Sequence, residues 1–355
     1  MSLCVHHYYP LGSDNVGDAL VAHAIRHAVT HHFGPAQFVD MPVNDRYPGN
    51  DRTLGLRGDN LDRSNAQADL VIVGGSNLLQ PRSRGRWGVF TDINSIARLK
   101  KPLLLTGMGT GSDFGQRVQS LKAPALAEVR ALHEKAFAAS VRDQRTADAL
   151  QRIGVQVRCT GCPVTFLTDA VVCRQPSDAP LFVSFPPPRI EKKRGGRGFM
   201  RQAMEYIAWL RDTGIPLVVT LHDRRDVEPA RQRVPAGVET FFTLDVAQQI
   251  EQFRRCRGVI GFRLHAALLG LALGKPVVPV GVDWRGRGFV TTFGLENQSV
   301  RPFQWRPFAR LQRLTDHLLA GDANMIEQQA EAKRRFGREH EGFWSEAVTT
   351  FHSQQ

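Results

Sequence analysis

An arginine and a histidine stand two residues apart in an otherwise apolar stretch, GVIGFRLHAALLGLALGKPVVPV, which spans residues 258–280. A buried charge is costly unless it is paired or bound to a ligand. The guanidinium of Arg263 could bind a carboxylate or phosphate with two parallel hydrogen bonds, and the imidazole of His265 could transfer a proton near neutral pH. Two interpretations stay open: a catalytic pair at the end of the strand-like GVIGF, or a salt-bridged arginine and a capping histidine at a helix start.

Three other segments carry charged residues where an apolar run gives way to a helix. In SVRD, Arg142 could bind an anion or an acceptor, with Asp143 holding it; the alternative is a plain helix cap and surface pair. In NVGD, Asp18 is expected as a helix N-cap that could also orient a sugar hydroxyl. Asp283 follows the last strand-like run and could hold a hydroxyl or pair with Arg285.

Glycine-rich turns follow several of the apolar runs. NVGD (15–18), which contains Asn15, offers backbone N–H groups at a helix start, which suits an anion. GGSN (74–77) and TGMGTG (106–111) would let a ligand approach the backbone at Gly74, Gly75, Gly107 and Gly109. None of these turns forms a Walker loop or a dinucleotide-binding fingerprint in the right setting.

Histidine and cysteine spacings offer two weak metal motifs. His23, His27 and His31 could share one helix face, but the sequence places no carboxylate beside them, so we expect a solvated face and no metal. Cys159 and Cys162 have ligand spacing without a second pair, which favours reduced structural thiols. Five scattered cysteines make a disulfide framework unexpected.

Strand-like and helix-like runs alternate along the chain, which favours parallel sheets covered by helices on both faces. Strands are expected in 3–9, 68–75, 101–111 and 215–223, and helices near 199–213 and 245–255. The pattern restarts after CRQPSDAP (173–180), and the tail from 307 to 351 is expected to be helical. We therefore predict an α/β protein with two Rossmann-like domains, 1–174 and 175–355, which face a cleft, and a helical C-terminal tail.

Composition narrows the partners. The 46 Lys and Arg against 34 Asp and Glu give a net charge of +12, which suits phosphorylated molecules, acidic glycans, a membrane surface or nucleic acid. The basic segment RIEKKRGGRGFMR (189–201) is expected as a solvated loop that could close over an anionic acceptor or touch a membrane carrying a lipid-linked sugar. No membrane span or secretory signal is recognisable, so we expect a cytoplasmic protein with at most peripheral membrane contact.

Taken in order, the motifs resemble the polysaccharide pyruvyl transferase family. The resemblance covers most of residues 15–295, and its pieces are NVGDALV (15–21), VIVGGSNLLQ (71–80), GMGTG (107–111), SVRDQRTADALQRIGV (140–155), TGCPVTFL (160–167), GFRLHAALLGLALGKPVVPVGVD (261–283) and RGFVTTFGL (287–295). Two positions depart from the family pattern: Cys162 stands where the family has an aspartate, and Arg285 and Arg287 stand near a position where it often has lysine.

The resemblance implies a glycosyltransferase-B type fold and transfer of a pyruvyl group from phosphoenolpyruvate to sugar hydroxyls, usually as a ketal, with no cofactor. Such an enzyme would act in exopolysaccharide or cell-envelope synthesis. The expected catalytic residues are His265, Arg263 and Asp18. The expected donor-binding residues are Arg142, Arg285, Gly74, Gly75, Gly107 and Gly109. The expected acceptor-binding residues are Asn15, Asp143 and Asp283.

Two other functions compete with this expectation. A glycosyltransferase of the same fold would use a nucleotide sugar, and it would need a ribose-binding acidic residue in the second domain. A non-catalytic binder of nucleic acid or acidic glycan would rest on the positive charge alone, and the sequence shows no RRM, KH, zinc-finger or helix-turn-helix signature. We therefore expect phosphoenolpyruvate and a sugar or glycan acceptor as partners, and no nucleic acid.

Overall fold

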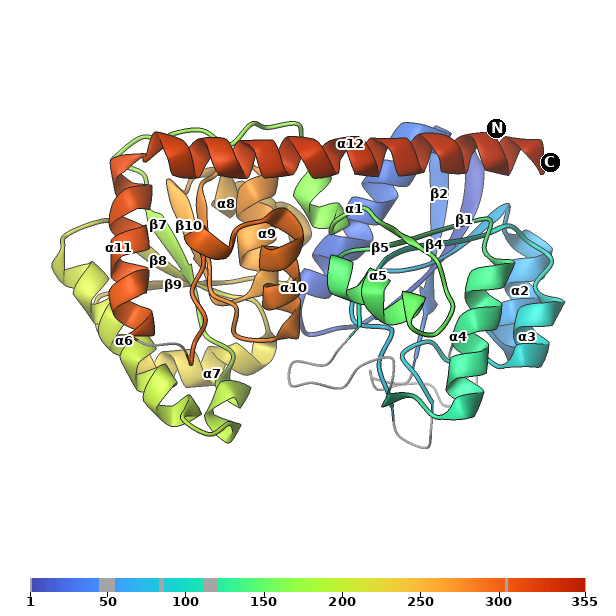
Figure 1. The fold of residues 1–355 in the computed structure, drawn as a ribbon, viewed down its shortest axis with the longest axis horizontal. Coiled ribbons are helices and arrows are strands. Elements are labelled where there is room, and N and C mark those ends of the chain that lie inside the picture. Colours follow the sequence, from blue (N-terminus) through green and yellow to red (C-terminus); the bar gives the residue numbers. More distant parts are fainter. Residues whose placement is uncertain (1, 45–54, 83–85, 111–119, 304–305, 355) are drawn as a thin grey trace. The chain divides into compact units, whose positions relative to one another are not determined.

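The computed structural model describes residues 2–44, 55–82, 86–110, 120–303 and 306–354. The chain forms two compact units. Unit 1 comprises residues 1–13, 18–163 and 336–355, and unit 2 comprises residues 14–17 and 164–335. Each unit is built on a parallel sheet of its own (Figure 1).

Unit 1 contains a six-stranded sheet with the order β2-β1-β3-β4-β5-β6, in which all neighbouring strands are parallel. The strands are β1 (Leu3–Tyr9), β2 (Ala36–Pro42), β3 (Leu70–Gly74), β4 (Leu103–Met108), β5 (Ala138–Val141) and β6 (Arg158–Cys159). The helices are α1 (Val16–Phe33), α2 (Gly58–Gln67), α3 (Ile93–Arg98), α4 (Ala123–Lys135) and α5 (Gln144–Gln151). Every residue of β3 and β4 is buried, as expected for parallel strands covered on both faces.

Unit 2 contains a five-stranded parallel sheet with the order β11-β10-β7-β8-β9. The strands are β7 (Leu181–Ser184), β8 (Leu217–Leu221), β9 (Glu239–Phe242), β10 (Gly258–Gly261) and β11 (Val277–Pro279). The helices are α6 (Gly196–Asp212), α7 (Arg224–Arg233), α8 (Val246–Arg254), α9 (Leu264–Ala272), α10 (Trp284–Phe293) and α11 (Pro307–Ala320), with short 3-10 helices η3 (Pro163–Phe166), η4 (Pro188–Lys192) and η5 (Glu296–Gln298).

The last helix, α12 (Ala323–Ser353), starts among the residues of unit 2 and ends among those of unit 1. Its C-terminal half joins unit 1 because aromatic side chains hold it there: Trp344 and Phe351 are buried, and both contact Phe33 of α1. The expected division into 1–174 and 175–355 did not include this return of the tail, and the units change over at Pro163 and Val164 instead.

Most elements predicted from the pattern are present. The expected strand at 3–9 is β1, the restart after residue 180 is β7, and the helices expected near 199–213 and 245–255 are α6 and α8. The helical tail is confirmed as α11 and α12. The segment 189–201 is not a loop, because most of it folds as η4 and the first turns of α6.

The predicted cap of α1 is wrong. The helix begins at Val16, and the side-chain oxygen of Asn15 accepts the backbone N–H of Gly17 at 2.9 Å. Asp18 lies inside the first turn, where it accepts a hydrogen bond from the hydroxyl of Ser13 at 2.7 Å. Gly34 follows the last helical residue with a φ of +88°, so the predicted stop is confirmed.

Candidate active site

The strand order of unit 2 reverses between β7 and β10. From β7 the chain proceeds to β8 and β9 on one side, and it later returns to add β10 and β11 on the other. In open parallel sheets, ligands bind outside the carboxyl ends of the strands at such a reversal. Arg263 and His265 follow β10 directly, so the fold places both at this point.

Arg263 is the residue before α9, and its backbone and side chain are both held by neighbours. Its N–H donates to the hydroxyl of Ser184, at the end of β7, at 2.9 Å. Its guanidinium forms a buried ion pair with Asp226 of α7. Among the described residues, its Nε–H has no hydrogen-bond acceptor although the atom is buried. The ion pair therefore fixes the guanidinium in place, and its Nε–H is a donor that a ligand could use.

His222 and Asp226 lie next to Arg263. The backbone N–H of His222 donates to the Asp226 carboxylate at 3.3 Å. Burial, together with the charges of Arg263 and His265, lowers the pKa of His222 to about 3, so this imidazole is neutral at pH 7. Burial raises the pKa of Asp226, and the nearby Arg263 opposes that shift. The cluster therefore contains the cation Arg263, the carboxyl group of Asp226 and the neutral ring of His222.

A short N-terminal segment completes this cluster. Residues 14–17 belong to unit 2 because they pair with the exit of β8. Val16 donates its N–H to the carbonyl of His222 at 3.0 Å, and Asn15 forms an isolated antiparallel bridge with Asp223. Asn15 is thereby brought to the same region of unit 2 as Arg263 and His265.

The imidazole of His265 lies against the backbone of Gly17. A Cβ atom at position 17 would overlap Nδ1 of the ring, so only glycine fits while His265 keeps this position. His265 is in the first turn of α9 and is buried, with 5% of its surface exposed. The glycine of NVGD thus has a packing reason that involves the predicted catalytic histidine.

A pocket of about 430 Å³ opens beside Arg263 within unit 2. Small-molecule sites commonly have volumes of this size. Its charged lining residues are the cations Arg189, Lys192, Arg225, Arg233 and Arg263 and the acids Glu191, Asp223 and Asp226. Each acid is paired with one of the cations. Arg189 and Lys192 of η4 add further positive charge, so the pocket favours an anionic ligand.

Asp223 is both a helix cap and a partner of Arg225. Its carboxylate accepts the Arg225 N–H at 3.0 Å and two guanidinium hydrogen bonds at 2.8 and 2.5 Å. Burial pulls the pKa of Asp223 upward, but these hydrogen bonds outweigh it and the pKa is lowered. Asp223 therefore stays ionised at the edge of the pocket.

Asp283 and Arg285 form the same kind of pair at the start of α10. Asp283 accepts the N–H groups of Arg285 and Gly286 at 2.9 and 3.0 Å, and the Arg285 guanidinium donates to it at 2.9 and 2.5 Å. The carboxylate thus caps α10 and pairs with Arg285. The donor role of Arg285 and the acceptor role of Asp283 stay predictions.

Apart from Asp18 in the first turn of α1, the predicted residues of unit 1 form a second group, at the ends of β3, β4 and β5. Arg142 is buried, and its guanidinium donates to the side-chain oxygen of Asn77. A Cβ at Gly109 would overlap that guanidinium, so the glycine permits its approach. Oδ2 of Asp143 lies 3.5 Å from Nε of Arg142. Oδ1 of Asp143 caps α5 by accepting hydrogen bonds from the backbone N–H and the hydroxyl of Thr146, at 2.8 and 2.9 Å.

In the glycine-rich turns of unit 1, some backbone N–H groups already donate hydrogen bonds within the protein. Gly75 donates its N–H to Thr106 and Gly109 donates to Ser76, both at 3.0 Å. Gly74 ends β3 and Gly107 lies near the end of β4. The amides of Gly75 and Gly109 hold the turns together. The donor-binding role of the four glycines stays a prediction. The roles of Asp18, Arg142 and Asp143 and the common cleft also stay predictions.

The cysteines match the expectation of reduced thiols, since all five are free. Cys159 and Cys162 lie near the end of the unit 1 sheet, and burial raises the pKa of the Cys159 thiol to about 12. This thiol is therefore protonated at neutral pH, which argues against a metal thiolate at Cys159.

Sequence reasoning missed Asp226 as the partner of Arg263, and His222 and Asp223 as charged or polar neighbours of that pair. A signal was present, because LHDRRD (221–226) places polar groups directly after the apolar run of β8. The signal could not be read alone, since only the strand order shows that β8 and β10 lie on either side of β7.

Comparisons with known proteins show the family from the sequence and the fold from solved structures. The sequence profile of one family, polysaccharide pyruvyl transferase, matches residues 15–283. A search of curated protein sequences finds no significant match.

Solved structures resemble the chain over nearly its whole length. A Listeria monocytogenes protein assigned as a UDP-N-acetylglucosamine 2-epimerase has a TM-score of 0.56 at 12% identity, covering 94% of this chain and 91% of that one. Sucrose-phosphate synthase from Thermosynechococcus elongatus has a TM-score of 0.53 at 13% identity, covering 99% and 98%. The glycotransferase of kitacinnamycin has a TM-score of 0.50 at 12% identity, covering 100% and 99%. These likenesses confirm the predicted glycosyltransferase-B type fold with two Rossmann-like units, and at such identities they show the fold alone.

Proposed function

Because this chain belongs to the polysaccharide pyruvyl transferase family, we propose that it transfers a pyruvyl group from phosphoenolpyruvate to sugar hydroxyls of a bacterial polysaccharide or its precursor. The chain is a transferase by its family. The donor, the ketal product and a place in exopolysaccharide or cell-envelope synthesis are the proposed parts. Their main structural support is the Arg263–His265 pair at the reversal of strand order, together with the basic pocket that Arg263 lines.

Phosphoenolpyruvate fits the chemistry of this pocket. It carries a phosphate and a carboxylate on three carbons, and both anions require guanidinium or ammonium partners. Arg263 offers a buried Nε–H that no described residue accepts, and Arg189 and Lys192 line the same pocket. We assign Arg263 to one of the two anions.

The reaction balances without an oxidant or a reductant. A proton adds to the methylene carbon of phosphoenolpyruvate, and the positive charge that develops at C2 is attacked by a sugar hydroxyl. Phosphate then leaves, and a second hydroxyl closes the ketal. The two hydroxyl protons end on the new methyl group and on the phosphate, so the proposal requires no redox cofactor.

His265 is the group we assign to proton transfer. An imidazole can hold and release a proton near neutral pH, and Gly17 fixes the position of this ring. His222 is unsuited to the role, because its lowered pKa keeps the ring neutral and it is fully buried behind Arg263. Asp18, Asn15, Asp143 and Asp283 remain proposed acceptor-side or catalytic residues.

A nucleotide-sugar glycosyltransferase is the second candidate, because the fold is shared with glycosyltransferases.

Among the described helices, none is long and apolar enough to cross a membrane. A phosphorylated three-carbon donor is a metabolite of the cytoplasm, and we propose the reaction takes place there, on an acceptor that is free or lipid-linked.

A thermal-shift screen separates the two candidates. The full chain is titrated with phosphoenolpyruvate and, in parallel, with UDP-sugars. The proposal expects phosphoenolpyruvate to raise the melting temperature in a concentration-dependent way, since a ligand that binds only the folded state stabilises it. A shift with UDP-sugars and none with phosphoenolpyruvate would favour the glycosyltransferase.

A further inference from the structure

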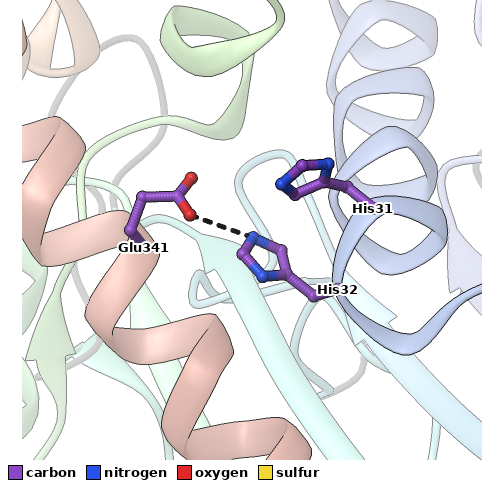
Figure 2. A group of neighbouring side chains, drawn as sticks. All are labelled: His31, His32 and Glu341. Carbon is purple, nitrogen blue, oxygen red and sulfur yellow. Dashed lines mark ion pairs between the residues drawn. The ribbon is translucent and has the colours of Figure 1, made fainter.

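Two histidines at the end of α1 meet a glutamate of α12 in unit 1. His31 and His32 come from the last turn of α1, and Glu341 comes from the part of α12 that packs in this unit. One ligand atom of each residue lies within 4.8 Å of the others. Figure 2 shows the two rings and the carboxylate pointing toward a common space.

The position of His32 is fixed by aromatic packing. Its ring stacks on Trp344 of α12, with centroids 5.9 Å apart and planes 9° from parallel. Trp344 is fully buried, and its indole N–H donates to Nε2 of His340 at 3.0 Å. The ring that faces Glu341 therefore has a defined place before any ligand arrives.

The distance between His32 and Glu341 fits two ligands of one metal ion better than a hydrogen bond. Nε2 of His32 lies 3.5 Å from Oε2 of Glu341, beyond the roughly 2.7–3.2 Å of a good N–H···O bond. Zinc–ligand distances of roughly 2.0–2.2 Å place neighbouring ligands of a tetrahedral ion about 3.4 Å apart. His31 is exposed, and its ring packs edge-on against that of His32, with centroids 4.7 Å apart.

The chemistry of the three groups supports the same conclusion. A neutral imidazole has a lone pair for a metal ion. A divalent cation would neutralise Glu341 and use both rings.

We propose that His31, His32 and Glu341 bind one divalent transition-metal ion of the zinc class, which joins the end of α1 to α12. Two imidazole nitrogens and one carboxylate oxygen suit zinc, nickel, cobalt or copper, whereas calcium and magnesium prefer oxygen ligands throughout. The ion's role is structural, because none of its ligands belongs to the proposed active site. The inference does not depend on the proposed function.

This site differs from the one the sequence suggested. The row of His23, His27 and His31 lacked a carboxylate, and a metal was therefore not expected. Among the described residues, the ligand group that forms contains only His31 of that row. The adjacent His32 and a residue more than three hundred positions away, Glu341, complete it.

Isothermal titration of the EDTA-treated full chain with zinc tests the proposal. Wild type should bind one ion per chain, and zinc should raise its melting temperature. Glu341→Gln keeps the shape of an exposed side chain and should weaken zinc binding by about tenfold or more, as should His32→Ala. His23→Ala, an exposed histidine on the same helix outside the group, is the matched control and should bind zinc like wild type.

Cobalt provides a second measurement that does not depend on stability. Wild type loaded with cobalt should show the visible absorption of a four-coordinate ion, and Glu341→Gln should lose it. The proposal is overturned if wild type binds no zinc, or if Glu341→Gln and His32→Ala bind it as tightly as His23→Ala.

Discussion

The imidazole of His265 lies against the backbone of Gly17, so closely that a Cβ at position 17 would overlap Nδ1. The contact joins the start of α1 to the start of α9 within unit 2. It gives a physical reason for the glycine in NVGD and fixes the ring to which we assign proton transfer.

Replacement of Gly17 by alanine should therefore displace His265. We expect Gly17→Ala to lower kcat by about 10²-fold, because a displacement of roughly 1 Å can cost that much. Steady-state kinetics with phosphoenolpyruvate and a sugar acceptor measure the effect. Gly337→Ala is the matched control, since nothing lies within 4 Å of a Cβ there. Equal losses in both variants would show that His265 is not affected through Gly17.

Removal of the imidazole tests its role directly. We expect His265→Ala to lower kcat by ~10²–10⁴ while the protein stays folded. Circular dichroism checks the fold, and release of inorganic phosphate from phosphoenolpyruvate measures turnover. A folded variant with unchanged kcat would remove His265 from the mechanism.

Asp226 pairs with the guanidinium of Arg263, so its negative charge lies beside the proposed donor site. Asp226→Asn should leave phosphoenolpyruvate binding unchanged or tighter, because the arginine loses its internal anion. The same change should reduce the free energy of unfolding by about 3–5 kcal/mol, the usual cost of breaking a buried ion pair. Calorimetric titration and denaturant unfolding measure the two effects. Weaker donor binding would mean that Asp226 is needed to hold Arg263 for the ligand.

Acid should destabilise unit 1 through His7. Burial, with the nearby Arg26, lowers the pKa of His7 to about 3. The unfolded chain takes up a proton below pH 6.5 and the folded chain does not, so this contribution to stability is present above pH 6.5 and is lost as the pH falls toward 3, at about 1.4 kcal/mol per pH unit.

His7→Leu should remove that slope. Among the described residues, neither ring nitrogen of His7 has a hydrogen-bond partner, so leucine should also make the protein at least as stable at pH 7. Denaturant unfolding of both proteins at pH 7, 6 and 5 measures the difference. Parallel curves would show that His7 is protonated in the folded state.

The strands and the family could be predicted from the sequence. Only some residues of the candidate site could be predicted in the same way. Apolar runs such as LVIVG and LLLTGM become β3 and β4 because parallel strands are buried on both faces. Arg263 and His265 could be predicted from the same kind of apolar run, because a charged residue inside such a run needs a partner or a ligand. Asp226 was missed because its pairing with Arg263 depends on the strand order, which is a long-range property.

The caps and the tail were harder for a related reason. Asp18 was expected as the cap of α1, but Asn15 has that place because residues 14–17 pair with the exit of β8. The return of α12 to unit 1 depends on contacts of Trp344 and Phe351 with Phe33, which no local pattern encodes. Local signals predicted the elements, and contacts distant in sequence decided their partners.

Calorimetric titration of phosphoenolpyruvate into wild type and Arg263→Lys tests the central claim most directly. Lysine keeps the charge but cannot bind an anion with two parallel hydrogen bonds. We predict that wild type binds phosphoenolpyruvate and that Arg263→Lys binds it more weakly by roughly 1.5–3 kcal/mol, the value of a charged hydrogen bond. Equal affinity in the two proteins would make Arg263 structural, and a wild type that binds a UDP-sugar but not phosphoenolpyruvate would contradict the proposed donor.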